Sequence, residues 1–197
     1  MNVIQIGLLL LSYVGGSIPF GLIFAKIFSN KDIRRIGSGN IGTANVIRNA
    51  GLLAGLLTFL FDFLKGLIPV LVALHYYNVL LGVLAGFMAV TGHIFPIFLR
   101  FSGGKGVATA FGVVLGLNYL TALISFGIFI LMIVIFRISS LSSLVATLSN
   151  LLLNIFVAFD KYIVLLNILL LLLIFFRHRE NIKRLISGTE PRMWGRS

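Results

Sequence analysis

Gly37-Ser-Gly-Asn-Ile-Gly-Thr-Ala-Asn45 is a glycine-rich polar stretch that separates the first two long apolar runs of the chain, 3–28 and 51–74. Three glycines within six residues allow positive φ angles and expose backbone N–H groups. The neutral polar side chains of the stretch are Ser38, Asn40, Thr43 and Asn45. Its flanking arginines are Arg34, Arg35 and Arg48. This pattern predicts an anion-binding loop at a membrane surface.

The composition indicates a multi-pass membrane protein. Hydrophobic residues make up 59% of the chain and charged residues 11%, and the mean hydropathy is +1.10, far outside the range of soluble proteins. Cysteine is absent, which excludes disulfides, thiolate nucleophiles and cysteine-based metal sites. Residues 1–28 lack a basic start and a small-residue cleavage pattern, so we expect a first membrane span there and not a cleaved signal.

The apolar runs predict an all-α membrane protein of about seven transmembrane helices, forming a single domain over 1–197. Most runs approach the ~20 residues that a helix needs to cross the hydrocarbon core. The 31 residues 106–136 are too many for one upright helix and few for two, so we divide them near Asn118. The expected spans are 3–28, 51–74, 79–99, 106–117, 119–136, 140–158 and 161–177.

The basic residues predict the orientation, because cytoplasmic loops of membrane proteins are enriched in lysine and arginine. With seven spans, one face carries a single basic residue, Lys161, and nearly all others fall on the opposite face. These are Lys26, Lys31, Arg34, Arg35, Arg48, Arg100, Lys105, Arg137, Arg177, Arg179, Lys183, Arg184, Arg192 and Arg196. We expect an external N-terminus and a cytoplasmic C-terminus. Topology signalling and contact with anionic lipid would account for most of this charge.

Two apolar runs contain polar or helix-breaking residues. Pro19 lies within the first run and predicts a kink, because proline removes a helical hydrogen bond. Asp62 and Lys65 lie three residues apart on one face of the second expected helix. Ionisable groups at membrane depth cost about 2.5–3.5 kcal/mol each, so we expect the two to pair. The pair has either a purely structural role or a role in supporting the site.

A second polar stretch, Phe101-Ser-Gly-Gly-Lys-Gly106, places a lysine among glycines at the start of an expected helix. Exposed amides and a positive charge beside a helix N-terminus favour an anion. The G-x-x-x-x-G-K-[ST] spacing of a Walker A loop is absent. His93 precedes this stretch at the end of a span, and it is either a packed histidine or a functional one. After the last run, residues 177–185 have the pattern of a short amphipathic helix.

These groups suit a substrate with a phosphate at one end and an alkyl chain at the other. The sequence has no H-E-x-x-H motif, carboxylate cluster or Cys-His set, so metal hydrolysis and a nucleophile triad have little support, and we expect no metal or cofactor. We expect membrane lipid as a partner and no nucleic acid.

The main alternative function is an anion or lipid-phosphate transporter. A transporter should have polar groups along a path to the far face of the membrane, and no such path is evident in the last three apolar runs. A purely structural membrane subunit would not need several polar loops on one face.

The motifs together resemble those of the PlsY family of bacterial membrane acyltransferases. The resemblance covers nearly the whole chain, with two departures from the common pattern: Gly-Thr-Ala-Asn at 42–45 replaces Gly-Ala-Thr-Asn, and Ser102 stands where lysine is common. The matching segments are Ser17-Ile-Pro-Phe-Gly21, Gly37-Ser-Gly-Asn-Ile-Gly-Thr-Ala-Asn-Val-Ile-Arg-Asn-Ala-Gly51, Asp62-Phe-Leu-Lys-Gly66, Gly92-His-Ile-Phe-Pro96, Gly103-Gly-Lys-Gly-Val-Ala-Thr109 and His178-Arg-Glu-Asn-Ile-Lys-Arg184.

The resemblance implies transfer of an acyl chain from acyl phosphate to glycerol 3-phosphate at the cytoplasmic face of the bacterial inner membrane. Acyl phosphate is an activated donor, so positioning and charge stabilisation suffice and no covalent intermediate is required. The oligomeric state stays open, and a monomer would be compatible with this reaction. The proton acceptor is either His93 or a phosphate oxygen of the substrate.

The expected site residues fall into two groups. The catalytic candidates are Ser38, His93 and Lys105. We expect Ser38 and Asn40 to donate to the acyl phosphate or to the developing oxyanion. Arg48 and Lys105, helped by Arg137, Ser142 and Asn181, are expected to bind the phosphate of glycerol 3-phosphate. The complete set of substrate-binding candidates is Gly37, Gly39, Asn40, Gly42, Thr43, Asn45, Arg48, Gly103, Gly104, Arg137, Ser142, His178, Glu180 and Asn181.

Overall fold

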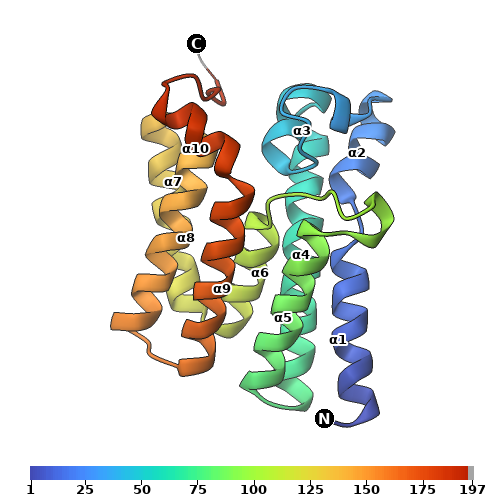
Figure 1. Cartoon of the computed structure of the whole chain (residues 1–197), viewed down its shortest axis with the longest axis vertical. Helices are drawn as coiled ribbons and strands as arrows, with labels where there is room; N and C mark the ends of the chain where they lie inside the picture. Colours follow the sequence, from blue (N-terminus) through green and yellow to red (C-terminus); the bar gives the residue numbers. More distant parts are fainter. Residues whose placement is uncertain (195–197) are drawn as a thin grey trace. The chain divides into compact units, whose positions relative to one another are not determined.

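The structure, a computed structural model, describes residues 1–194, and every regular element in that range is helical (Figure 1). Arg196, one of the basic residues named above, lies outside the described residues. The chain forms two compact units, Met1–Leu117 and Asn118–Ser197. The first contains α1 Val3–Gly16, α2 Phe20–Ser29, η1 Ile33–Arg35, α3 Thr43–Ala50, α4 Leu52–Tyr76, α5 Val79–Ile94, η2 Ile97–Leu99 and α6 Val107–Leu117. The second contains α7 Tyr119–Phe136, α8 Ser139–Phe156, α9 Lys161–Arg177 and α10 Arg179–Ile186.

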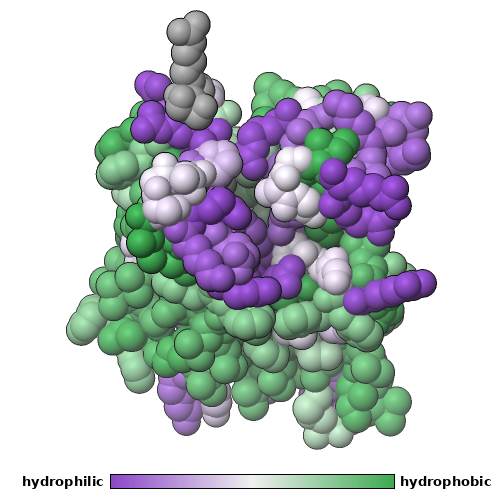
Figure 2. All heavy atoms as spheres, turned by 45° about the horizontal axis from the view of Figure 1, so that its top comes forward, coloured by the Kyte–Doolittle hydropathy of each residue, from purple (hydrophilic) through white to green (hydrophobic). Residues whose placement is uncertain are grey.

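The helices confirm an all-α, multi-pass membrane architecture. Five helices in the described residues are long and apolar enough to cross a membrane, and a sixth is counted if α9 and α10, which meet at 64°, form one span. Each predicted span overlaps a helix, but α6 has only 11 residues and α9 has 17, so the count of seven stays a prediction. In Figure 2, hydrophilic residues of the first unit gather around α3 and the loop before it, and those of the second around α10.

The first span is broken, where the sequence predicted a kink. Helix α1 ends at Gly16 and α2 begins at Phe20, with Pro19 as the residue before its first turn. Lys65 of α4 donates from Nζ to the carbonyl of Ile18 at 2.9 Å. The break therefore has its own hydrogen-bond donor inside the protein, as a backbone interruption at membrane depth requires.

Small residues let the helices of the first unit approach closely. Gly112 of α6 lies against the backbone of Phe63 in α4, and Gly66 of α4 lies against the backbone of Thr109 in α6. A side chain at either glycine would overlap main-chain atoms of the facing helix. Close backbone contact is a principal source of helix association in lipid, where burial of apolar surface gives little driving force.

Hydrogen bonds between polar side chains join α7 and α8 in the second unit. Asn154 Nδ2 donates to Thr121 Oγ1 at 3.0 Å, and Asn150 Nδ2 donates to Ser125 Oγ at 3.1 Å. All four side chains are buried. Such bonds contribute about 0.6 kcal/mol each on average between membrane helices, and they also fix the register of the two helices.

The α4–α6 contact gives the first testable prediction. Gly112→Ala should lower the thermal unfolding midpoint in detergent, because the new methyl group meets the Phe63 carbonyl, and overpacking costs about 1–3 kcal/mol. Gly127→Ala in α7 is the matched control, since no atom lies within 4 Å of that added methyl. An equal midpoint for the two variants would contradict the close contact.

Candidate functional site

The first glycine loop is a tight turn that leads into α3. Gly37 and Gly39 have φ angles of 61° and 69°, which glycine adopts without strain. Asn40 accepts a hydrogen bond on Oδ1 from the Gly42 N–H at 2.8 Å, and Gly42 directly precedes the first helical residue, Thr43. The loop therefore ends at a helix N-terminus, where unpaired N–H groups favour an anion.

The side-chain amide of Asn45 holds this loop together. Its Nδ2 donates to three carbonyls, those of Ile33 at 3.2 Å, Ile36 at 3.0 Å and Asn40 at 2.9 Å. Its Oδ1 accepts from the Ser38 N–H at 3.1 Å and from Asn49 Nδ2 at 3.0 Å. Asn45 is 2% exposed, so both ends of this amide are used within the protein. The sequence placed Asn45 among the substrate-binding residues, and the geometry makes it the residue that orders the loop.

Charged residues before the loop are paired with one another. Asp32 accepts two hydrogen bonds from the Arg34 guanidinium, at 2.9 and 2.7 Å. These side-chain bonds from Arg34 lower the pKa of Asp32 to about 2, so the carboxylate is ionised at neutral pH. Arg35 lies 3.8 Å from the same carboxylate. The two arginines that precede the loop, Arg34 and Arg35, therefore share an acidic partner, Asp32.

The second glycine loop packs beside the first through a shared apolar cluster. Ile33 before the first loop and Ile41 within it lie in one buried cluster with Val46, and Leu99 of η2 packs against that cluster. Arg100 and Phe101 follow Leu99 with positive φ angles of 51° and 60°. This sharp turn is followed by Gly103, Gly104 and Lys105. Backbone hydrogen bonds from Gly103 and Gly104 fix the position of this loop.

Those contacts are made to the end of α5. The N–H of Gly103 donates to the Ile94 carbonyl at 3.1 Å, and the N–H of Gly104 donates to the His93 carbonyl at 3.1 Å. Gly104 also lies directly against the His93 ring, so a side chain there would overlap the imidazole. His93 itself is 4% exposed, and its Nδ1 lies 3.5 Å from Asp62 Oδ1. The structure thus brings His93, Gly103 and Gly104 together, and Lys105 follows directly.

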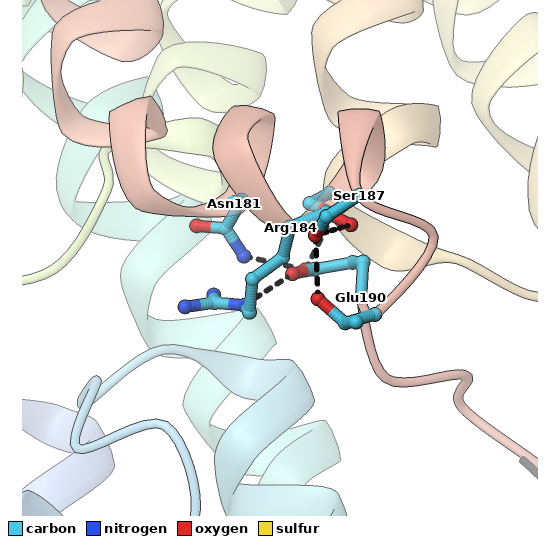
Figure 3. Close-up of polar contacts among 6 residues, drawn as sticks. Asn181, Arg184, Ser187 and Glu190 are labelled. Atoms are coloured by element: carbon cyan, nitrogen blue, oxygen red, sulfur yellow. Dashed lines mark hydrogen bonds and ion pairs between the residues drawn. The ribbon is translucent and has the colours of Figure 1, made fainter.

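A carboxylate that the sequence analysis missed organises the second unit. Glu190 accepts hydrogen bonds from Ser140 Oγ at 2.7 Å, from Arg184 Nε at 2.7 Å and from Asn181 Nδ2, and Figure 3 shows Asn181 and Arg184 directed at it. Burial disfavours the ionised form, but these hydrogen bonds outweigh it and hold the pKa of Glu190 below its usual range. The sequence offered one sign that Glu190 has a specific role: the chain has only five acidic residues.

Three other candidates of the second unit take part in hydrogen bonds with the backbone of that unit. Ser142, buried in α8, donates to the Ile138 carbonyl at 2.9 Å. His178, also buried, has Nδ1 2.8 Å from the Ile174 carbonyl. Arg137 ends α7 with a φ of 61°, and its carbonyl accepts from the Met193 N–H at 2.7 Å. Glu180 is more exposed and lies 3.3 Å from Lys183.

These observations define a class of protein: a multi-pass helical membrane protein with ordered polar loops and basic side chains suited to an anion. Within residues 1–194, no group of three or more His, Asp or Glu side chains could hold a metal ion. The sequence model of the family described as glycerol-3-phosphate acyltransferase matches residues 6–188. The chain therefore belongs to the glycerol-3-phosphate acyltransferase family.

Individual relatives match over nearly their full length. A glycerol-3-phosphate acyltransferase of Macrococcus caseolyticus is 44% identical over 187 residues, covering 94% of this chain and 95% of the relative. Glycerol-3-phosphate acyltransferase 2 of Bacillus anthracis is 41% identical, with 98% and 100% covered. A crystal structure of PlsY (YgiH), an integral membrane glycerol 3-phosphate acyltransferase, in its glycerol 3-phosphate form is 40% identical, with a TM-score of 0.93 and 97% and 96% covered.

A second structure of PlsY (YgiH), in its lysophosphatidic acid form, is 39% identical to this chain. Its TM-score is 0.89, and the match covers 95% of this chain and 94% of the other. The resemblance noted in the sequence is thus confirmed at the level of the family.

The second unit gives a second testable prediction. Glu190→Ala should lower the thermal unfolding midpoint by an amount equivalent to about 1–3 kcal/mol, because buried donors lose their acceptor. Glu180→Ala is the matched control, since its exposed pairs contribute only about 0–1 kcal/mol. The Glu190 contribution should be complete above the ordinary carboxyl pKa and be lost as the pH falls through the lowered one. Equal midpoints for both variants at neutral pH would contradict the assignment.

Proposed function

We propose that this protein transfers a fatty acyl chain from acyl phosphate to the 1-hydroxyl of glycerol 3-phosphate. The products are lysophosphatidic acid and inorganic phosphate, which makes this the first step of phospholipid synthesis. The observation that carries the proposal is the match, over nearly the whole chain, to a protein with a glycerol 3-phosphate form and a lysophosphatidic acid form. The second molecule is an acyl ester of the first, so the pair corresponds to an acceptor and its acylated product.

The acyl phosphate donor is what the resemblance to the PlsY family implies, and the chemistry of the site is compatible with it. An acyl phosphate carries its own activated leaving group, so no nucleotide, metal or coenzyme A is needed for transfer. The first glycine loop, ordered by Asn45 and ending at the N-terminus of α3, is suited to a phosphoryl group. Ser38 and Asn40 lie on this loop, and we assign them to the donor phosphoryl group or to the oxyanion that develops on the carbonyl. Gly37, Gly39, Gly42 and Thr43 complete the loop.

The acceptor's phosphate is assigned to the basic and polar residues that remain. Arg48 follows the first loop on α3, and Lys105 follows the double glycine of the second. Because the N–H groups of Gly103 and Gly104 already donate to carbonyls, these two residues act by placing Lys105. In the second unit, Arg137, Ser142, His178, Glu180 and Asn181 stay predicted substrate-binding residues, and Glu190 accepts a hydrogen bond from Asn181.

Transfer is proposed to occur in one displacement. The hydroxyl oxygen of glycerol 3-phosphate forms the new ester bond to the carbonyl carbon, and the bond from that carbon to the phosphate oxygen breaks. The hydroxyl proton passes to a phosphate oxygen, so charge and atoms balance without a protein base. The burial of His93 and the close contact of its ring with Gly104 favour this route over His93 as the base.

We propose the following placement in the cell. The protein would lie in the bacterial inner membrane with seven spans, an external N-terminus and a cytoplasmic C-terminus, and with both glycine loops on the cytoplasmic side. The two units would act as one acyltransferase domain, 1–197, which is supported by a family match that extends over both of them. A monomer contains every residue assigned above.

An assay of the purified protein tests the reaction. With palmitoyl phosphate and glycerol 3-phosphate supplied in detergent or lipid, and no nucleotide or coenzyme A, we expect phosphate release that depends on glycerol 3-phosphate and yields lysophosphatidic acid. Folded protein that releases no phosphate would contradict the proposal. Uptake of labelled phosphate into sealed vesicles would then test transport.

Variants separate the proposed roles in the same assay. Ser38→Ala should lower kcat by about 10²-fold, as loss of one oxyanion donor does. Lys105→Ala should raise the KM for glycerol 3-phosphate. His93→Asn should raise the KM for glycerol 3-phosphate, because the His93 ring contacts Gly104 next to Lys105, but it should retain the greater part of kcat. A loss of kcat in this variant as large as that of Ser38→Ala would assign the base to His93.

A further inference from the structure

Asp62, Lys65 and His93 form a buried charged cluster that the proposed reaction does not use. The side chains of Asp62 and Lys65 are 3% and 6% exposed, and the Lys65 ammonium lies 2.7 Å from Asp62 Oδ1. Both residues lie within α4, which is long and apolar enough to span the membrane. Burying an ion pair costs several kcal/mol per charge in desolvation, and apolar residues of similar size often stabilise a protein as well or better. Stability alone therefore accounts poorly for this pair.

Lys65 connects the pair to the first glycine loop. Its ammonium donates to the Ile18 carbonyl at 2.9 Å, inside the break between α1 and α2, and it lies 5.6 Å from the centroid of the Phe20 ring. The next residue of α2, Gly21, packs directly on the backbone carbonyl of Ile41, within the first loop. The backbones of Gly21 and Ile41 are in direct contact, with no room for a side chain between them. A shift of the start of α2 would therefore displace Ile41 or break this contact.

Asp62 connects the pair to the second glycine loop. Its Oδ1 lies 3.5 Å from His93 Nδ1, so one carboxylate faces both the ammonium and the imidazole. The opposite edge of the imidazole lies against Gly104, and the His93 carbonyl accepts the Gly104 N–H. The orientation of the ring therefore determines where Gly104, and with it Lys105, can lie.

We propose that Asp62 and Lys65 are a positioning pair that fixes the first glycine loop relative to the second. The connection runs from Ile41 through α2 to Lys65, then through Asp62 and His93 to Gly104. All of these residues belong to the first compact unit. The inference deepens the proposed function, on which it rests for its catalytic consequence: the pair would set the distance between the donor's phosphoryl group and Lys105. In this proposal neither residue touches a substrate.

The spacing of the loops can be measured without reference to the reaction. Because the chain has no cysteine, spin labels can be attached at two introduced cysteines, Arg35→Cys before the first loop and Ser102→Cys in the second, both at exposed positions. Pulsed electron paramagnetic resonance should give a narrow distance distribution in otherwise unchanged protein. Asp62→Asn and Lys65→Met should each broaden or shift it. An unchanged distribution in both variants would overturn the proposal, whatever reaction the protein catalyses.

Thr58→Val is the matched control. Thr58 lies one turn before Asp62 on α4, is fully buried and donates only to the Ala54 carbonyl of its own helix. Valine keeps the methyl group that faces Gly21. The distance distribution and the kinetic constants of this variant should match those of the unchanged protein.

The kinetic prediction uses the unlabelled enzyme. Misplacement by about 1 Å can cost about 10²-fold in rate, so Asp62→Asn should lower kcat/KM by that order in protein whose unfolding midpoint shows it to be folded. Combined with Lys105→Ala, its effect should be less than additive in free energy, because both changes remove the action of Lys105. Two outcomes would contradict a positioning role. One is a double variant whose loss of kcat/KM, as a free energy, equals the sum of the two single losses. The other is an Asp62→Asn protein with a lower unfolding midpoint but unchanged kcat and KM.

Discussion

The side-chain amide of Asn45 hydrogen-bonds to backbone groups of the first glycine loop and of the segment before it. The proposed chemistry depends on this loop. Buried backbone groups of an irregular segment need hydrogen-bond partners within the protein. Asn45 accepts a hydrogen bond from the Ser38 N–H and donates to three backbone carbonyls, so these carbonyls point toward the Asn45 side chain. The ordered loop leads directly into the N-terminus of α3 and carries the small polar side chains of Ser38 and Asn40. A phosphoryl group is the chemical partner that such a surface suits best.

The rest of the first unit holds this loop in place through contacts that only small residues permit. Glycines of α2, α4 and α6 lie directly against the backbone of neighbouring elements. The same principle fixes the second loop, where Gly104 lies on the His93 ring. In the second unit a carboxylate has the corresponding role. Glu190 accepts hydrogen bonds from polar side chains at the start of α8 and along α10.

Much of the fold follows from the sequence, because membrane spans have a strong compositional signal. The apolar runs, the interruption at Pro19, the Asp62–Lys65 pair and the helix after residue 177 are all present in the structure. The number of spans could not be settled in this way. Helix length depends on where caps form, and Asn118 caps α7 after a helix α6 of only 11 residues.

The roles of individual site residues were less accessible to sequence reasoning. A polar side chain in a glycine loop can face a ligand or face the loop itself, and only the geometry showed that the Asn45 amide is used internally. Glu190 lies in an irregular segment after the last helix, with no periodicity to mark it. Its partners come from residues up to 50 positions away, and local pattern carries no information about such contacts.

The central claim is that the loop ordered by Asn45 binds the donor's phosphoryl group. The direct test is calorimetric titration of an acyl phosphonate, a non-transferable analogue of acyl phosphate, in the absence of glycerol 3-phosphate. The account predicts that Asn45→Ala and Ser38→Ala each weaken binding at least about tenfold, a loss of about 1.4 kcal/mol, whereas Asn181→Ala leaves it unchanged. Wild-type affinity in folded Asn45→Ala and Ser38→Ala proteins would contradict the account.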